Sequence, residues 1–365
     1  MKLQISRSKM LAACQLVGAA TAARSPKVIL QNVKAIAEAD RLTMVATDLE
    51  VGIRYEVPDV QIEEPGEAML AVGRLIAILR ESSDEMLAID ADERRCQVCT
   101  NTSEFEMPSE DPSGFPDVAA MVDNPCFESP AGLLRTMIRR TSFAAAKQDT
   151  KYAITGILCE VDADKVSMIA TDTRRLACHS GTIAARVDPK RLTALIPVKA
   201  MSLIERTMGD DAEMVRVSMR TNDVLFRTER ATVYSRLLEG RFPPHRDIMP
   251  KKANAKIALS VRPFKSAVRQ AAIMTDDDSR RVMFSFAPGK LTLQAQGAAT
   301  GKSKVDMPLE FSGSPISINF DPHFLIDMLN LLDDDEALAI ELTDAQKPAL
   351  FVCGDEFKYL VMPLT

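Results

Sequence analysis

Two stretches of this chain repeat one pattern about 124 residues apart. Residues 41–54 and 165–178 each run from an alternating apolar stretch into a Thr-Asp pair, Thr47-Asp48 in the first and Thr171-Asp172 in the second. Alternation is typical of a strand, and short Thr and Asp side chains bond the backbone of a turn. A period of this length is that of a whole domain. The pattern therefore predicts one chain built from copies of a module.

Three similar openings indicate three modules rather than two. Each is a short strand-like segment followed by a helix with an apolar face. In the first two openings we expect Ser6 and Ser129 to cap the helix, with Pro130 in its first turn. The three strand-like segments are residues 1–5, 127–130 and 256–260.

The same inner order follows each opening: strands, a second helix and further strands. Two helices among about eight strands, three times over, predict an α+β fold in which the helices of each module pack on antiparallel sheets. Segments rich in proline, glycine and charge, at residues 108–123 and 240–254, mark the linkers. The second helices are expected at residues 72–81, 199–208 and 322–332. The modules are expected at residues 1–123, 124–253 and 254–365.

The composition is that of an ordinary globular protein, with 46% hydrophobic and 26% charged residues in a chain of 365. There is no apolar run long enough to span a membrane and no signal-peptide pattern at the start, so we expect a cytoplasmic protein without a membrane partner. Seven scattered cysteines do not suggest a disulfide framework. The net charge of −6 argues against general affinity for nucleic acid but leaves room for a local basic surface.

Catalytic and metal-binding patterns are absent from the sequence. The three histidines do not have metal-ligand spacing, and there is no GxSxG, Walker or GxGxxG motif. Asp48 and Asp172 occupy equivalent places in different modules, so we expect them to hold turns and not to share one site. No catalytic residue, metal or cofactor is expected.

Basic residues recur along the predicted helices. Arg135 and Arg139 are i,i+4 neighbours, and Lys265 and Arg269 repeat that spacing in the third module. Such residues on one helix are ordinary surface charge, but their recurrence predicts a track that contacts phosphates without reading sequence. The second helices add Arg74, Arg80, Lys199 and Arg206.

The chain ends in an apolar segment, residues 359–365, where termini are usually polar. It is either a last edge strand or an adaptable apolar surface for partner peptides, with Met362, Pro363 and Leu364 at its centre.

Taken together, these motifs resemble the bacterial DNA polymerase III beta subunit family, in order and along the whole chain. The residues that carry the resemblance are Arg24, 46–50, Gln148-Asp149, 170–172 with Arg175-Leu176, 239–243 and 359–363. The resemblance implies three clamp modules per subunit and a head-to-tail homodimer that forms a ring of six modules. It also implies a processivity factor that encircles double-stranded DNA and tethers the replicative polymerase, with the clamp loader and other clamp-binding proteins as further partners.

The resemblance also assigns site residues. For the partner-peptide pocket it implies Ile154, Thr171, Arg174, Arg175, Leu176, Pro243, Ile248, Val361, Met362 and Pro363. For DNA it implies Arg24, Gln148, Lys151, Tyr152, Lys199 and Arg206, to which the helix pattern adds Arg135 and Arg139. The pocket rim departs from the family, because Asp247 stands where a base is common and Thr173-Arg174 replaces Gly-His. We expect Met362 and Leu176 to be partly exposed.

The subunit joint is expected to pair two edge strands, residues 103–107 of module one and 300–305 of module three. Glu104 and Glu106 lie on the first and Lys302 and Lys304 on the second, which reverses the charge polarity usual in the family. Unrelated surface charges remain the alternative. The interface is predicted to include Arg74, Phe105, Ile273, Met274, Lys302 and Lys304.

Two other classes of function stay open at this point. A metal-dependent nuclease or other hydrolase would need carboxylates that converge, and the repeat places the Thr-Asp carboxylates in separate modules. A non-catalytic repeat scaffold for protein partners would not need basic residues on several helices.

Overall fold

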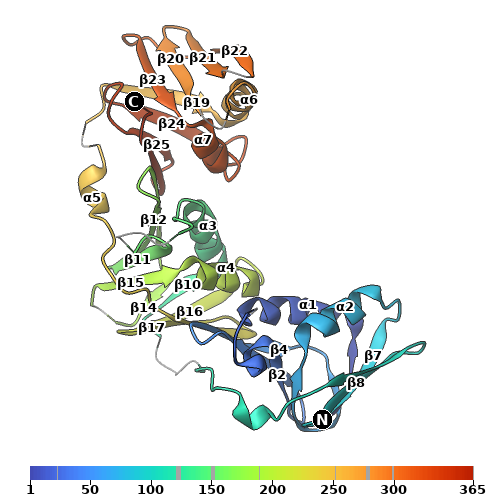
Figure 1. Cartoon of the computed structure of the whole chain (residues 1–365). Coiled ribbons are helices and arrows are strands. Elements are labelled where there is room, and N and C mark those ends of the chain that lie inside the picture. Colours follow the sequence, from blue (N-terminus) through green and yellow to red (C-terminus); the bar gives the residue numbers. More distant parts are fainter. Residues whose placement is uncertain are drawn as a thin grey trace. The chain divides into compact units, whose positions relative to one another are not determined.

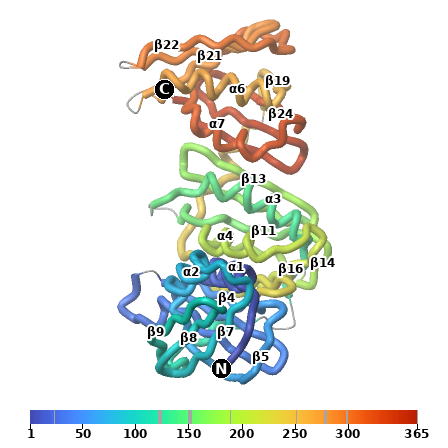
Figure 2. The backbone as a smooth tube through the Cα atoms, turned by 90° about the vertical axis from the view of Figure 1, so that its right-hand side faces the viewer, coloured from blue at the N-terminus to red at the C-terminus, as the bar shows by residue number. Residues whose placement is uncertain are grey.

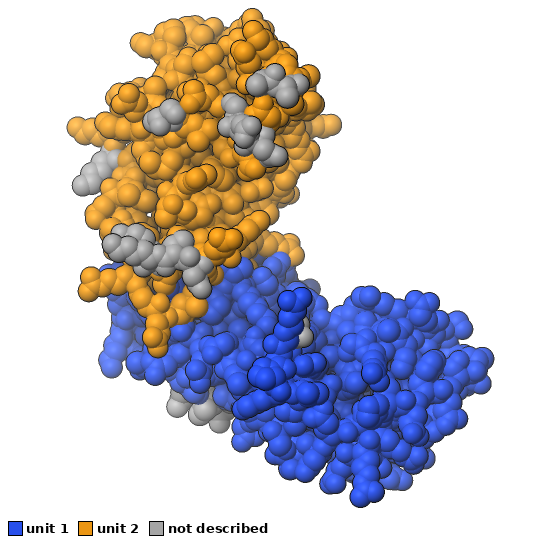
Figure 3. Space-filling view, viewed as in Figure 1, with its two compact units in different colours: residues 1–135, 183–237 blue, residues 136–182, 238–365 orange. Residues whose placement is uncertain are grey.

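Antiparallel strand pairing organises the whole chain. The computed structural model describes residues 1–22, 24–120, 125–148, 153–188, 190–250, 252–276, 280–297 and 300–364. These residues form two units: residues 1–135 with 183–237, and residues 136–182 with 238–365 (Figures 1 and 3). The predicted α+β class is confirmed, because a few short helices accompany extensive antiparallel sheets.

Unit 1 contains two sheets. The first has the strand order β5-β1-β7-β8-β9, with β5 Gln61–Glu64, β1 Lys2–Ser6, β7 Met86–Ala91, β8 Arg95–Cys99 and β9 Glu104–Pro108. The second has the order β14-β10-β16-β17-β18-β4-β3-β2-β6. Its strands are β14 Ala185–Arg186, β10 Phe127–Pro130, β16 Met214–Met219, β17 Asp223–Arg227, β18 Ala231–Arg236, β4 Val51–Val57, β3 Leu42–Thr47, β2 Val33–Ala37 and β6 Gly66–Leu70. Strand β15 (Leu192–Pro197) and helices α1 (Arg7–Val17), α2 (Val72–Glu81) and α4 (Val198–Thr207) complete the unit.

In unit 2, seven strands follow the order β11-β12-β13-β26-β25-β24-β19. They are β11 Gly156–Asp162, β12 Lys165–Thr171, β13 Arg175–Thr182, β26 Phe357–Val361, β25 Ala349–Cys353, β24 Ala337–Leu342 and β19 Ala255–Ser260. The other sheet, β22-β21-β20-β23, has β22 Gly301–Pro308, β21 Lys290–Gly297, β20 Val282–Ala287 and β23 Ile316–Phe320. Helices α5 (His245–Ile248), α6 (Val261–Ala272) and α7 (Pro322–Leu329) belong to this unit, and α3 (Ala131–Ser142) contains the unit boundary. Figure 2 shows α6 running beside β21 and β22.

The apolar faces of the opening helices are buried as their spacing predicts. Met10 and Cys14 of α1 are inaccessible to solvent, as are Phe264 and Val268 of α6. These side chains fill the space between helix and sheet, which is the main stabilising contribution in a fold of this kind.

The expected capping role of Ser129 is wrong. Ser129 and Pro130 belong to strand β10, where Ser129 pairs with Val215, and α3 begins only at Ala131. The Ser129 hydroxyl is buried without a hydrogen-bond partner in the described part of the chain. Pairing with β16 therefore extends the strand by two residues beyond the point at which local sequence favours a helix.

The first Thr-Asp turn is held by its own side chains. The Thr47 hydroxyl donates to the Val51 carbonyl at 2.9 Å, and Asp48 Oδ1 accepts the amide N–H groups of Glu50 and Val51 at 2.9 and 2.7 Å. Leu49, which lies between Asp48 and Glu50 in this turn, has a φ of 79°, in the left-handed region.

The second turn repeats these bonds. The Thr171 hydroxyl donates to the Arg175 carbonyl at 2.6 Å, and Asp172 Oδ1 accepts the N–H groups of Arg174 and Arg175, both at 3.0 Å. Thr173 has a φ of 77°, nearly equal to that of Leu49 in the first turn. The structural role predicted for both aspartates is confirmed.

Two strands predicted to be sheet edges are edges. Strand β9 ends the five-stranded sheet and β22 ends the four-stranded sheet, and each has a neighbour on one side only within the described structure. The observed strands, Glu104–Pro108 and Gly301–Pro308, differ by only a few residues from the predicted ranges 103–107 and 300–305.

The positive φ of Thr173 yields a prediction about stability. A β-branched residue is strained in the left-handed region, whereas glycine is not. Thr173→Gly should raise the free energy of unfolding by about 1 kcal/mol, since the relief of strain exceeds the extra entropy of the unfolded glycine chain. Denaturant unfolding followed by circular dichroism measures this change.

Thr182→Gly provides the matched control, because Thr182 is an exposed residue of strand β13. The same replacement should there lower stability by about 0.5–1 kcal/mol. Equal losses at both positions would mean that the Thr173 backbone stores no strain.

Candidate functional site

Helix α6 of unit 2 carries a basic face. Arg262, Lys265 and Arg269 follow one another at i, i+3 and i+7, opposite the buried side of the helix. They line a groove of about 550 Å³. The Arg262 side chain remains 82% exposed although its Nε lies 3.9 Å from Asp334 Oδ2. Sequence reasoning identified Lys265 and Arg269 but missed Arg262, which the same spacing extended by one turn would have found.

Two of the cations predicted to contact DNA also make contacts within unit 1. The Nζ of Lys199 lies 2.5 Å from Asp48 Oδ2, so a residue of α4 is tied to the first Thr-Asp turn. The Arg206 guanidinium donates to the carbonyl of Gln15, at the end of α1, at 2.8 Å. Both side chains thus help to hold α4 against the first 50 residues of the chain.

Arg135 is engaged more fully. Its guanidinium forms an ion pair with Asp211 and donates to the Gly209 carbonyl at 2.7 Å, and only 17% of its side chain is exposed. It braces α3 against the loop that follows α4. The other residues predicted to contact DNA are Arg24, Arg139 and Gln148, which are exposed, and Lys151 and Tyr152, which lie outside the described residues.

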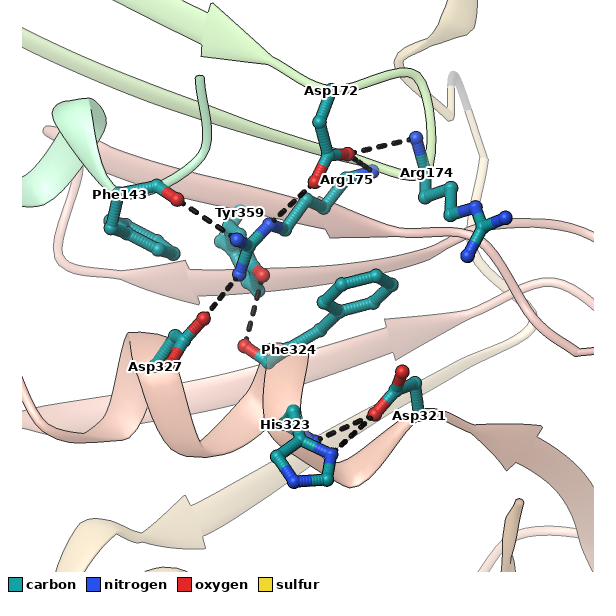
Figure 4. Close-up of polar contacts among 9 residues, drawn as sticks. All are labelled: Phe143, Asp172, Arg174, Arg175, Asp321, His323, Phe324, Asp327 and Tyr359. Atoms are coloured by element: carbon teal, nitrogen blue, oxygen red, sulfur yellow. Dashed lines mark hydrogen bonds and ion pairs between the residues drawn. The ribbon is translucent and has the colours of Figure 1, made fainter. Parts of the chain in front are cut away.

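Arg175 forms a node of polar contacts in unit 2 (Figure 4). Its Nε donates to Asp172 Oδ2 at 3.0 Å, and its two terminal nitrogens donate to Asp327 Oδ2 at 2.7 Å and to the Phe143 carbonyl at 2.9 Å. One guanidinium therefore joins the second Thr-Asp turn, helix α7 and the segment after α3. The resemblance predicts a residue of the partner pocket at this position. In the structure, the guanidinium instead holds the surrounding elements in place.

Aromatic rings complete the node. The Arg175 guanidinium lies 4.7 Å from the ring centre of Phe324 and 5.4 Å from that of Phe143, within the range of cation–π attraction. The Tyr359 hydroxyl donates to the Phe324 carbonyl at 2.9 Å, and burial raises the pKa of this phenol. The strand that ends at the C-terminal segment is thus tied to α7.

The residues predicted for the partner pocket include both buried and exposed side chains. Ile154, Thr171, Leu176 and Val361 are all buried. The expectation that Leu176 is partly exposed is wrong, because this residue of β13, a strand between β12 and β26, has only 1% of its surface exposed. Met362, just beyond β26, is 41% exposed as expected.

The linker that carries Pro243 and Ile248 is fixed by Glu160. Glu160 Oε2 lies 2.8 Å from a terminal nitrogen of Arg246 and 3.8 Å from His245 Nε2. The short helix α5 is thereby held against strand β11. Pro243 is half-buried, whereas Ile248 is 45% exposed and offers an apolar side chain to solvent.

The residues predicted for the subunit joint are accessible. Phe105 on β9 is 37% exposed, and Ile273, just after α6, is 69% exposed. Lys302 and Lys304 are exposed on β22 and line a groove of about 650 Å³ across the outer face of the sheet. Arg74 is exposed and Met274 is half-buried.

His179 is an unusual buried group on β13, the strand that also carries Arg175. It lies on β13 with 1% of its surface exposed, and neither ring nitrogen has a hydrogen-bond partner among the described residues. Burial, assisted by the positive charge of Arg140, lowers the pKa of His179 to about 4. The imidazole is therefore neutral in the folded protein near neutral pH.

In the ranges that the structure describes, no group of three or more His, Cys, Asp or Glu side chains could hold a metal ion. No helix within those ranges is long and apolar enough to cross a membrane.

Comparison with known protein families gives three matches in series. Residues 1–119 match the N-terminal domain of the DNA polymerase III beta subunit, residues 129–244 its central domain and residues 246–365 its C-terminal domain. The three-module organisation expected from the repeat is confirmed.

Individual relatives agree along the full length. Beta sliding clamps from Chlamydia pneumoniae and Pseudomonas putida are each 27% identical, over 100% of this chain and 99% and 100% of their own. A crystal structure of a sliding clamp from Pseudomonas aeruginosa bound to griselimycin is 26% identical with a TM-score of 0.92, covering 100% of this chain and 99% of that one. A sliding clamp structure from Bacillus subtilis has the same TM-score at 22% identity and the same coverage, which shows a shared fold.

The depressed pKa of His179 predicts a pH dependence of stability. Its pKa is lower in the folded state than the ordinary value of 6.5, so the unfolded chain takes up the proton first as pH falls. The contribution of His179 is present above pH 6.5 and is lost as pH falls toward about 4, by up to about 1.4 kcal/mol per pH unit.

His179→Leu removes this titration and the two unpaired nitrogens. Urea unfolding of both proteins between pH 7 and pH 4 should show a smaller loss of stability in the variant. Parallel curves would contradict the account, because carboxylates titrate alike in both chains and cancel in the difference.

Proposed function

The chain belongs to the DNA polymerase III beta subunit family, and we propose that it is a sliding clamp, a processivity factor that encircles duplex DNA and tethers the polymerase. The observation that carries the proposal is the series of three matched domains along one chain. We further propose that it works in the cytoplasm as an accessory subunit, with no reaction of its own.

The basic face of α6 supports contact with DNA. Arg262, Lys265 and Arg269 are spaced to meet phosphates, and contacts to phosphates carry no sequence information. An encircling protein needs only weak contacts of this kind, because topology and not affinity keeps it on the duplex. A net charge of −6 does not oppose such binding when the cations are local, and it limits attachment by other surfaces.

A closed ring requires that two copies join by their free edges. We propose that β9 of one copy pairs with β22 of the next, because each is the last strand of its sheet and an unpaired edge seeks a partner. Glu104 and Glu106 are exposed on β9, and Lys302 and Lys304 on β22. Within each pair the spacing is i,i+2, so both charges face one side and can meet across the new ladder.

The rim formed by the exposed Arg174, Ile248 and Met362, together with the half-buried Pro363, is proposed to bind peptide segments of the replicative polymerase, the clamp loader and other clamp-binding proteins. Thr171 and Arg175 position this rim, while Ile154, Leu176 and Val361 form its floor. Met362 suits the role, because a flexible thioether side chain adapts to different apolar partners.

The observations do not favour a hydrolase. Asp48 Oδ1 accepts two backbone N–H groups and its Oδ2 pairs with Lys199. Asp172 is occupied in the same way, with Arg175 as its ion partner. Both carboxylates thus stabilise turns. A repeat scaffold without DNA remains the alternative, and the following experiment decides between the two.

Retention on DNA should depend on topology. The protein would be loaded by a clamp loader onto nicked circular DNA and filtered through a gel column in moderate salt, where surface charges are screened. We expect it to remain on the circles and to leave after one restriction cut, because a ring slides off a free end. Equal retention on circular and linear DNA, or none on either, would contradict the encircling clamp.

The joint should respond to charge exchange. Lys302→Glu with Lys304→Glu should weaken the dimer at least tenfold, since four carboxylates then face one another across each joint. Adding Glu104→Lys and Glu106→Lys to the same chain should restore it, as measured by analytical ultracentrifugation. A weakened dimer without rescue would refute this pairing of charges.

A further inference from the structure

Arg174 and Met362 are neighbours across the pairing of β13 with β26. Arg175 is in register with Val361, and the Met362 N–H donates to the Arg174 carbonyl at 2.8 Å, which extends the ladder by one pair. Directly opposed residues of an antiparallel pair point to the same face of the sheet, with Cβ atoms about 5 Å apart. Arg175 and Val361 are buried, whereas Arg174 and Met362 are both exposed to solvent.

The position of Arg174 is fixed by its backbone. Its N–H donates to Asp172 Oδ1 at 3.0 Å and its carbonyl accepts from Met362, while the preceding Thr173 holds a left-handed φ of 77°. The backbone from which the side chain extends is thus held in place, which limits where the guanidinium can reach.

Arg174 differs from two other arginines of unit 2 in its ion pairing. Arg175 is paired with Asp172 and Asp327, and Arg246 is paired with Glu160. Arg174 is exposed, and no carboxylate in the described structure lies within ion-pair distance of it. Figure 4 shows its guanidinium pointing away from the Asp172–Arg175–Asp327 node. An exposed guanidinium on a backbone paired with that of an exposed methionine complements an anion attached to an apolar group.

We propose that Arg174 selects partner peptides in which a carboxylate adjoins the apolar residue that packs on Met362. This inference rests on the proposed partner site and assigns its charge preference. The carboxylate is either the peptide's C-terminus or an Asp or Glu side chain, because both present two oxygens to the fork of an arginine.

Three fluorescein-labelled peptides separate these sources: Gly-Ser-Gly-Leu-Leu-Phe with a free C-terminus, its C-terminal amide, and the amide of Gly-Ser-Gly-Asp-Leu-Phe. Fluorescence anisotropy would give their Kd values for the full-length protein. A charge-assisted contact predicts that at least one acidic peptide binds about tenfold more tightly than the neutral amide. Arg174→Ala should abolish that ratio, and Arg174→Lys should retain part of it.

Arg216→Ala is the matched control, because Arg216 is an exposed arginine on β16 and its loss should leave the ratio unchanged. The truncation that removes residues 362–365 tests the partner site itself. If the wild-type protein binds all three peptides equally and Arg174→Ala changes none of them, the inference is wrong while the partner site stands. If no peptide binds, or if the truncated protein binds as well as the intact one, the partner site is wrong and the inference falls with it.

Discussion

Main-chain hydrogen bonds between strands distant in sequence are the constraint on which the rest of this structure depends. In unit 1, β18 pairs with β4, from Ala231 with Tyr55 to Ser235 with Val51, and this joins residues of the matched central domain to the N-terminal one. In unit 2, β13 pairs with β26, from Arg175 with Val361 to His179 with Phe357, and this joins the central domain to the C-terminal one. A module cut out of the chain would expose these edges, with their unpaired N–H and C=O groups.

The second of these pairings also creates the candidate partner surface. It places the Thr171–Arg175 turn beside the end of the chain, so that Arg175 can reach Asp327 on α7 while Arg174 emerges next to Met362. This turn is itself held by the Thr171 hydroxyl and the Asp172 carboxylate, which form hydrogen bonds with its backbone groups. The same few residues thus stabilise the fold and shape the candidate partner surface. Substitutions that loosen the turn should therefore affect partner binding through geometry as well as through lost contacts.

Much of the fold could be predicted from the sequence because local signals agree with the final structure. The predicted helix at 72–81 is α2, and the predicted strands around both Thr-Asp pairs form as expected. The capping of α3 by Ser129 failed because a long-range pairing with Val215 outweighs a local preference, which a single sequence does not reveal.

The candidate site was less accessible to sequence reasoning. Exposure of Leu176 was mispredicted because it depends on the strand that lies beside β13, and that strand comes from the other end of the chain. The intrachain partners of Arg135, Asp211 and Gly209, are more than 70 residues away, so no spacing rule indicates that its guanidinium is occupied. Arg262 was missed although its helical spacing was visible.

Two complementary edges in different units of one chain can produce either a closed ring or an open filament, depending on whether the head-to-tail contacts close on themselves. Multi-angle light scattering over a range of concentrations distinguishes these outcomes directly. A closed ring of two copies should have a mass of twice 40.1 kDa that does not grow as concentration rises through the micromolar range. A mass of 40.1 kDa at every concentration, or one that increases without limit, would contradict the closed two-copy ring.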